Sequence, residues 1–268
     1  MSERFRTTRA FYLGAACLTL IATVLRTLSL TLCLDRTSGY FRAGAALPVC
    51  YQIFTALSLL ALLLFPLLAL KDRVPQGQRE HTKFSGASAL LLVLLFFLNF
   101  IGACTQKSDL LPTAIWVLGL LFLLGGTVYF ILQAFRARLH VTANTLTVFG
   151  CLTIFGVACL IAFTYFDIAT PMNAPHKTDL HLALLAVLLY LLYELREIAG
   201  IPRPRALATF TALTFFLTLT VGTSDLVAHL FGVYSNTTYL FQDVLLIGFA
   251  LYTAARGASL ALISEAKN

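Results

Sequence analysis

Ionisable residues that interrupt apolar segments are the first candidates for chemistry in this chain. Arg26 stands in the apolar run LIATVLRTLSLTLC, Asp243 stands in the last apolar segment, and Asp167 ends another. Asp225 and His229 are four residues apart, a spacing that puts both on one face of a helix. Because a charge inside hydrocarbon is costly unless it is paired or functional, these five residues predict a polar cavity that binds a small polar ligand.

The partner of Arg26 is predicted from its depth in the membrane. Arg26 lies six residues before Leu32, the expected outer end of its segment, which is ~9 Å at 1.5 Å per residue. Asp243 lies six residues after Thr237, where the last segment begins, and is therefore at the same depth. This match predicts an Arg26–Asp243 ion pair in preference to an Arg26–Asp225 pair. The alternative is that the long Arg26 side chain extends to the outer headgroups.

Histidines and aspartates near the same ends of the segments raise the question of a metal site, because imidazole and carboxylate groups together bind zinc. No two histidines share a helix at ligand spacing: His176 and His181 straddle a loop and a helix start, and His229 is alone. The sequence therefore predicts no metal and no cofactor. Four residues are interpreted first as interfacial caps of helix ends, namely Asp35, Asp167, Asp179 and His181, and of these Asp167 is also kept as a candidate for the cavity.

Motifs that would indicate an enzyme do not occur in the sequence. Eight-helix intramembrane proteases use paired glutamates, whereas the stretch YELREIAG has no adjacent pair. No serine stands in a recognisable motif with a histidine base. An enzyme is therefore the weaker hypothesis, in the form of a membrane-embedded metal-dependent hydrolase.

The elements that position the candidate residues follow from composition. Hydrophobic residues make up 59% of the 268 residues and charged residues 12%, with a mean hydropathy of +0.86, which excludes a soluble globular protein. A helix needs ~20 apolar residues to cross a bilayer. Segments of about that length predict an all-α, polytopic transmembrane helical bundle of about eight spans, at 10–33, 46–70, 87–105, 111–134, 144–166, 179–195, 206–230 and 237–256.

Lysines and arginines predict the orientation, because short loops rich in these residues stay in the cytoplasm. Fourteen of the nineteen lie on the side of the two chain termini, four lie on the other side, and Arg26 lies within a span. Both termini are therefore predicted to be cytoplasmic, in a bacterial plasma membrane. The same distribution assigns the net charge of +7 to contacts with the anionic lipid of the bilayer and not to nucleic acid.

A single integral membrane domain, residues 1–268, is expected. Its two halves, 1–140 and 141–268, show a possible 4+4 internal repeat in parallel orientation, because LCLDRTS corresponds to TYFDIATP, and FFLNFIGACTQKSDL to FFLTLTVGTSDL. The alternative is that helices rich in leucine and phenylalanine resemble one another by composition alone.

Three functions are compatible with these features. The first is a small-solute transporter or permease-like protein whose halves enclose an outward-facing polar site for a small polar ligand. The second is a non-catalytic membrane sensor or subunit that acts through a protein partner or as a homo-oligomer, and the third is the hydrolase. The first hypothesis is supported by the possible repeat and by the clustering of charged residues at one depth. Against it, no span is clearly broken at mid-membrane by Gly or Pro, as transporters often require.

Overall fold

The computed structural model describes residues 3–36, 38–69, 83–104, 110–166, 171, 173–234 and 237–263. Its elements are helices α1 (Glu3–Cys33), α2 (Ala46–Ala69), α3 (Lys83–Cys104), α4 (Leu110–Ala134), α5 (Arg136–Leu139), α6 (Ala143–Phe166), α7 (Pro175–Ile198), α8 (Pro204–Leu230) and α9 (Thr237–Ile263). No strand occurs in these ranges. The prediction of an all-α protein is confirmed for this part of the chain.

Eight of the helices are 22 to 31 residues long and fall on the predicted spans. Within the described ranges, six of them are long and apolar enough to cross a membrane, namely α1, α2, α4, α6, α7 and α8. α3 adds a shorter apolar stretch, Phe84–Asn99. The chain is therefore a helical bundle of the membrane type, and the count of eight spans stays a prediction.

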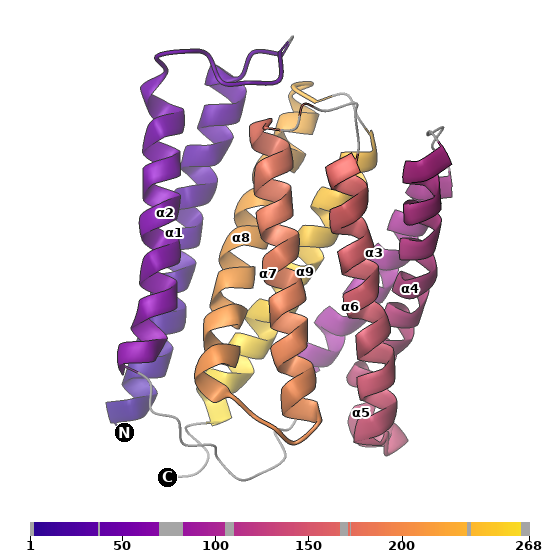
Figure 1. Ribbon diagram of the computed structural model, residues 1–268. Helices are drawn as coiled ribbons and strands as arrows, with labels where there is room; N and C mark the ends of the chain where they lie inside the picture. The colour runs from indigo at the N-terminus through magenta and orange to yellow at the C-terminus, as the bar shows by residue number, and fades with distance from the viewer. Residues whose placement is uncertain are drawn as a thin grey trace.

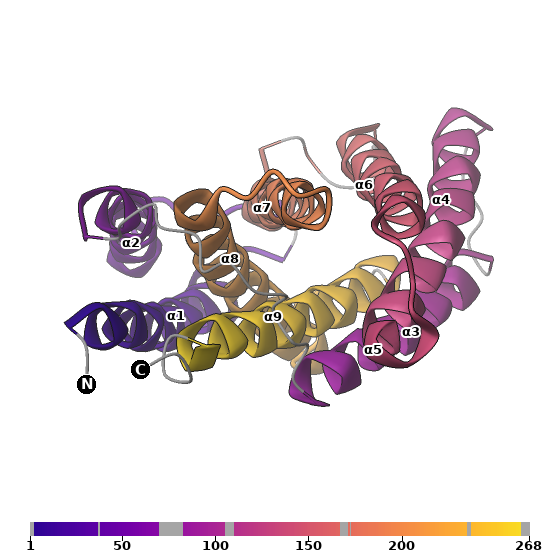
Figure 2. The same ribbon diagram turned by 90° about the horizontal axis from the view of Figure 1, so that it is seen from below.

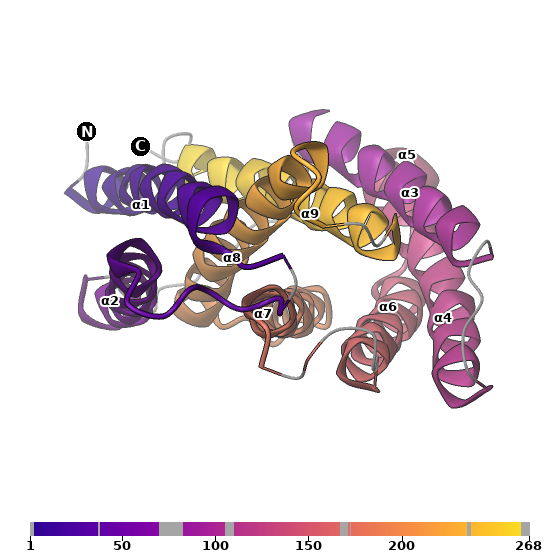
Figure 3. The ribbon, with the colours of Figure 1, turned by 90° about the horizontal axis from the view of Figure 1, so that it is seen from above.

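α8 and α9 form the centre of the bundle. α8 packs along α9 and also contacts α1, α2 and α7, while α9 contacts α3. Figures 2 and 3 show α9 running obliquely across the bundle, with α1 and α2 on one side and α3, α4 and α6 on the other. In α8, 72% of the most apolar stretch is buried. This helix is therefore surrounded mainly by protein.

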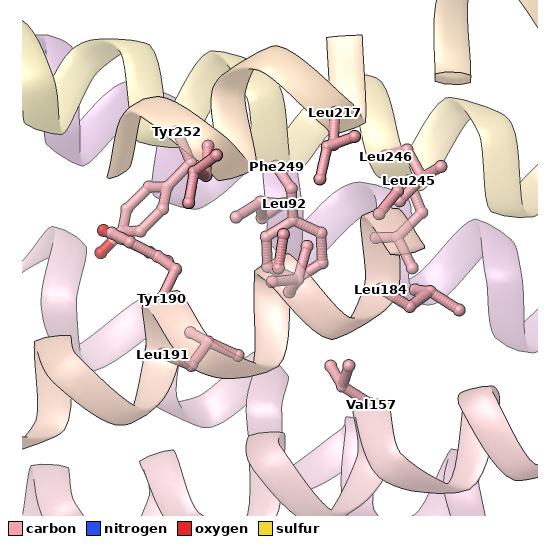
Figure 4. Packing of buried hydrophobic residues seen from close by; sticks show 14 of the residues in the cluster. Leu92, Val157, Leu184, Tyr190, Leu191, Leu217, Leu245, Leu246, Phe249 and Tyr252 are labelled. Carbon is pink, nitrogen blue, oxygen red and sulfur yellow. The ribbon is translucent and has the colours of Figure 1, made fainter. Parts of the chain in front are cut away.

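The apolar core lies between the central helices and their neighbours. Leu92 of α3, Val157 of α6 and Phe249 of α9 are all buried in it (Figure 4). Large apolar side chains such as Leu20 and Leu57 are exposed on the outside of the bundle. An apolar exterior of this kind is what a lipid-facing surface requires.

α8 ends in a glycine turn that shapes the site described below. Gly232 has φ +64°, and its N–H donates to the carbonyl of His229 (2.9 Å). The N–H of Val233 donates to the carbonyl of Ala228 (2.8 Å). These two hydrogen bonds form a Schellman motif, which favours glycine because the backbone is left-handed there. The turn places Tyr234 against the small apolar cluster at the ends of α1 and α8.

The two predicted halves differ in how their helices pack. α6, α7, α8 and α9 contact one another in chain order, whereas the α1–α2 pair contacts neither α3 nor α4 among the described residues. The internal repeat therefore stays a prediction. The start of α1 and the end of α9 lie at the same end of the bundle (Figure 1). We call the opposite end, where α1 ends, the outer end.

Candidate functional site

Arg26 lies inside a network of acidic side chains near the outer end. Its Nη1 donates to Asp225 Oδ1 (2.6 Å) and its Nη2 to Asp225 Oδ2 (3.1 Å). Its Nε donates to Asp179 Oδ2 (2.8 Å), and Nη1 also donates to Ser224 Oγ (2.5 Å). Arg26 and Asp225 are both 0% exposed. The bidentate pair, a strong and directional form of ion pair, is thus withdrawn from both lipid and water.

The predicted Arg26–Asp243 pair is wrong in its acidic member, although a carboxylate partner inside the bundle was correctly expected. Depth does not separate Asp225 from Asp243, because both lie near the outer ends of their helices. The choice follows from packing, since α1 lies along α8 and has only a small contact with α9. Extension of Arg26 to the headgroups is also wrong, because its side chain is 1% exposed.

Asp179 was interpreted from the sequence as a helix cap, and the structure places it in the Arg26 network instead. Besides its bond with Arg26, Asp179 Oδ2 accepts a hydrogen bond from the Tyr51 hydroxyl (3.1 Å). This carboxylate therefore connects α7 to both α1 and α2. Sequence reasoning missed Tyr51 and Ser224, because an uncharged hydroxyl in a helix is too common to indicate a site.

His176, at the start of α7, lies beside the same carboxylate. Its Nδ1 is 2.9 Å from Asp225 Oδ2, and because an ionised carboxylate only accepts, Nδ1 is the protonated nitrogen. The Tyr234 ring packs on the rings of His176 and His229, at centroid distances of 4.9 and 5.3 Å. Burial raises the pKa of the Tyr234 phenol above its usual value. Tyr234 is therefore protonated and able to donate a hydrogen bond.

His229 and Asp243 complete this group of residues, which we call the outer cluster: Tyr51, Arg26, His176, Asp179, Ser224, Asp225, His229, Tyr234 and Asp243. His229 Nδ1 donates to the backbone carbonyl of Asp225 (2.9 Å) and lies 3.2 Å from Asp243 Oδ2. We assign the hydrogen bond to the carbonyl, which is nearer, and treat the contact with Asp243 as electrostatic. Both oxygens of Asp243 are buried, and neither accepts a hydrogen bond within the described part of the chain.

Four of the five predicted site residues thus lie together in the structure: Arg26, Asp225, His229 and Asp243. The fifth, Asp167, lies outside the described residues. His176 was considered only as one half of a histidine pair and was not included in the predicted site. Its contacts come from α8 and from the turn after it, which no local spacing could indicate.

The outer cluster contains more acidic than basic groups. Arg26 supplies one positive charge, and the three carboxylates are those of Asp179, Asp225 and Asp243. With neutral imidazoles, the groups joined by these contacts have an excess of two negative charges. His176, Asp225 and Asp243 each offer a ligand atom, and these atoms lie within 4.8 Å of one another. The arrangement can therefore take up protons or a cation.

A second buried polar group lies nearer the inner end and was not predicted from the sequence. Glu194 of α7 is 0% exposed. Its Oε1 accepts hydrogen bonds from Tyr190 Oη (3.0 Å), Tyr252 Oη (2.8 Å) and Arg256 Nε (3.0 Å), and its Oε2 accepts from Tyr129 Oη (3.0 Å). Figure 4 shows the rings of Tyr190 and Tyr252 close together with their hydroxyl groups at one side. We call these five residues the inner cluster.

The two clusters differ in how far their carboxylates are satisfied. Four donors surround Glu194, which has about four acceptor positions, so its hydrogen-bonding capacity is filled. The donors come from α4, α7 and α9, and the inner cluster therefore joins three helices. Asp243 of the outer cluster has no such donors among the described residues. The inner cluster is suited to holding the fold, and the outer cluster to binding.

The chain matches no family model, and no curated protein or solved structure is significantly similar to it. The functional assignment therefore depends on the geometry of the two clusters.

Proposed function

We propose that this protein is a membrane transport protein that moves a small polar solute and binds a cation at the outer cluster during the transport cycle. The observation that best supports this is Asp243, which is 0% exposed and accepts no hydrogen bond among the described residues. A buried carboxylate without hydrogen bonds is costly, and a proton or a cation lowers that cost. Ionisable residues that face the interior of a transmembrane bundle mark ion pathways and proton relays.

The position of the outer cluster supports exchange with the aqueous phase on that side. His176 is the second residue of α7 and His229 the last but one of α8, so both lie at outer helix ends. Asp243 is the seventh residue of α9 and lies about one to two turns deeper. Along their helices, the two histidines are therefore nearer the outer end of the bundle than the carboxylate of Asp243 is.

The surroundings that suit this function are those of a bacterial plasma membrane. The proposed orientation has the start of α1 and the end of α9 in the cytoplasm, and the outer cluster near the opposite surface, because most lysines and arginines belong to the first side. Exposed apolar residues such as Leu20, Leu57 and Leu121 would then face the lipid bilayer.

Electrical recording from proteoliposomes on a solid-supported membrane tests this function. Pools of small polar solutes are applied at different pH values and with different cations. We expect at least one pool to evoke a transient current with the wild-type protein, and Asp243→Asn to abolish that current. Asp35→Asn is the matched control, because Asp35 lies at the same end of the bundle, outside the helices, where it accepts a hydrogen bond from Ser38 Oγ (2.9 Å). The control should keep the wild-type current.

A membrane sensor or subunit that works through a protein partner or as a homo-oligomer is the second candidate. The observation that favours it is the inner cluster, whose filled hydrogen bonds join α4, α7 and α9 and resist movement between them. A solute pool that raises the melting temperature of the purified protein but evokes no current would support this candidate and contradict transport.

A further inference from the structure

We infer that the outer cluster binds a divalent first-row transition-metal ion of the Zn²⁺ or Mn²⁺ type through His176, Asp225 and Asp243. The ligand atoms of these three residues, from α7, α8 and α9, lie within 4.8 Å of one another, and all three residues are buried. The inference deepens the proposed function by naming the cation. It is tested by binding to the purified protein, so it can fail while transport stands, or stand while transport fails.

The donor set points to this class of metal. One imidazole and two carboxylates are ligands that Zn²⁺ and Mn²⁺ accept, whereas Ca²⁺ and Mg²⁺ prefer sites made only of oxygen. Three protein ligands also leave positions for water or for a polar solute, as in open zinc sites.

The surroundings of Asp243 are a second, independent indication that a ligand binds at this site. Its carboxylate is 0% exposed, and within the described chain it accepts no hydrogen bond, although it lies beside two other possible ligands. His229 Nδ1 lies 3.2 Å from Oδ2 of Asp243, but that nitrogen already donates to the backbone carbonyl of Asp225. A metal ion would give this carboxylate a positive partner, which the described residues do not provide while His229 is neutral.

Asp225 is held in place without a metal. Both carboxylate oxygens of Asp225 accept hydrogen bonds from Arg26, at 2.6 and 3.1 Å, and Oδ2 also accepts one from His176 Nδ1 at 2.9 Å. Without a metal, this N–H···O contact fixes the ring. Metal binding needs the other tautomer, with the proton on Nε2, so that the lone pair of Nδ1 faces the ion that Asp225 also binds.

The charges around the site do not cancel the attraction for a cation. The guanidinium of Arg26 forms ion pairs with both Asp225 and Asp179, so its single positive charge already faces two carboxylates. Asp243 adds a third negative charge. Lys177, the residue after His176 in α7, is also buried. If its charge is counted beside that of Arg26, the three carboxylates still leave one negative charge in excess.

The test uses the untagged, full-length protein, purified and stripped with a chelator. Zn²⁺, Mn²⁺, Mg²⁺ and Ca²⁺ are titrated separately, and binding is followed by calorimetry and by the melting temperature. We expect one equivalent of Zn²⁺ or Mn²⁺ to bind and to raise the melting temperature, with little response to Mg²⁺ or Ca²⁺. His176→Gln and Asp243→Asn should each weaken binding about tenfold or more.

His181→Gln is the matched control. His181 lies on the same helix as His176 and uses Nδ1 for the backbone carbonyl of Lys177 (2.7 Å), so its loss should leave the affinity unchanged. Co²⁺ added to the wild-type protein provides a readout that needs no variant, because its visible absorption reports bound nitrogen and oxygen ligands. Equal affinities in the wild type and in both variants, or no metal binding together with a melting temperature that responds only to pH, would overturn the metal site.

Discussion

At the scale of single residues, Arg26 shows how a guanidinium is accommodated inside an apolar helix. It makes a fork of two hydrogen bonds with Asp225 and a further one with Asp179, and it is fully buried. Each member of such a pair is tolerated in a low-dielectric interior because the other is present. Arg26 therefore joins α1 to both α7 and α8, and the energetic effect of replacing it depends mainly on Asp225, which accepts two of these hydrogen bonds.

A double-mutant cycle tests this dependence. Arg26→Ala and Asp225→Ala should each lower the free energy of unfolding by about 3–5 kcal/mol, since each removes the main partner of a buried charge. The double variant should lose clearly less than the sum. The measurement is denaturant-induced unfolding in mixed micelles. Arg26→Ala combined with Glu194→Ala serves as the control and should be additive within about 0.5 kcal/mol, because the two residues belong to separate clusters. An additive Arg26–Asp225 cycle would contradict the pairing.

Glu194 provides a second residue-scale prediction. Glu194→Gln removes the charge that faces Arg256 Nε at 3.0 Å, so the free energy of unfolding should fall by about 3–5 kcal/mol. Glu197→Gln, three residues further along α7, should cost less than about 1 kcal/mol, because its contact with Arg256 is long, at 3.9 Å, and partly exposed. Both variants are compared by the same unfolding assay. Equal losses would contradict a special role for the inner cluster.

At the scale of helices, glycines allow close contacts between neighbouring helix backbones. A Cβ at Gly125 of α4 would lie 2.7 Å from Leu152 of α6, and one at Gly156 of α6 would lie 2.9 Å from Leu123 of α4. Small residues at such positions let two helix backbones approach in a membrane, where packing and not water drives association. Gly222 has the same function between α8 and α9, beside the outer cluster.

Gly222→Ala should therefore disturb both stability and the site. The new Cβ would lie 2.7 Å from the backbone oxygen of Asp243, which forces α8 and α9 apart at a cost of about 1–3 kcal/mol. We also expect the variant to lose cation binding, because Asp243 moves with α9. Gly14→Ala is the matched control, since a Cβ there meets nothing within 4 Å. Unfolding and cation titration measure both effects, and identical behaviour of the two variants would refute the close contact.

At the scale of the whole molecule, polarity is divided between the two ends of an apolar core. The outer cluster joins α1, α2, α7, α8 and α9 and contains Asp243, whose carboxylate accepts no hydrogen bond from the described residues, whereas the inner cluster joins α4, α7 and α9 with its acceptors filled. Along α7 and α9, the buried residues Leu184 and Phe249 lie between members of the two clusters. Hydrogen bonds of the inner cluster thus join helices at the inner end, whereas at the outer end a buried carboxylate has no hydrogen bond among the described residues.

Labelling of introduced cysteines tests the orientation of this molecule. In a background without native cysteines, Phe231→Cys, at the exposed outer end of α8, should react with an impermeant thiol reagent added outside intact cells. Arg203→Cys, before the start of α8, should react only after the cells are opened. The reverse pattern would place the outer cluster on the cytoplasmic side and contradict the charge-based orientation.

The positions of the helices were predictable from the sequence. A helix makes its backbone hydrogen bonds within one segment, so the length and apolar composition of that segment are enough to indicate it. The predicted span 46–70 is α2, Ala46–Ala69, and the predicted span 206–230 is α8, Pro204–Leu230. The predicted span 179–195 is too short, because α7 begins at Pro175, before its apolar part. A proline is well tolerated in the first turn of a helix, and the helix extends into the polar interface.

Residues near the site were predictable in kind and depth but not in their partners. Sequence alone determined that Arg26 needs a carboxylate near the outer end, because charge and distance along a helix are local properties. Only the tertiary structure decided that Asp225 and not Asp243 is the partner of Arg26. The four hydrogen-bond donors around Glu194 are likewise evident only in the tertiary structure. The physical reason is that the depth of a residue is set by its position along one helix. Which side chain it faces depends on how the apolar surfaces of different helices pack against one another. Because these surfaces have similar composition, the sequence alone does not determine which helices become neighbours.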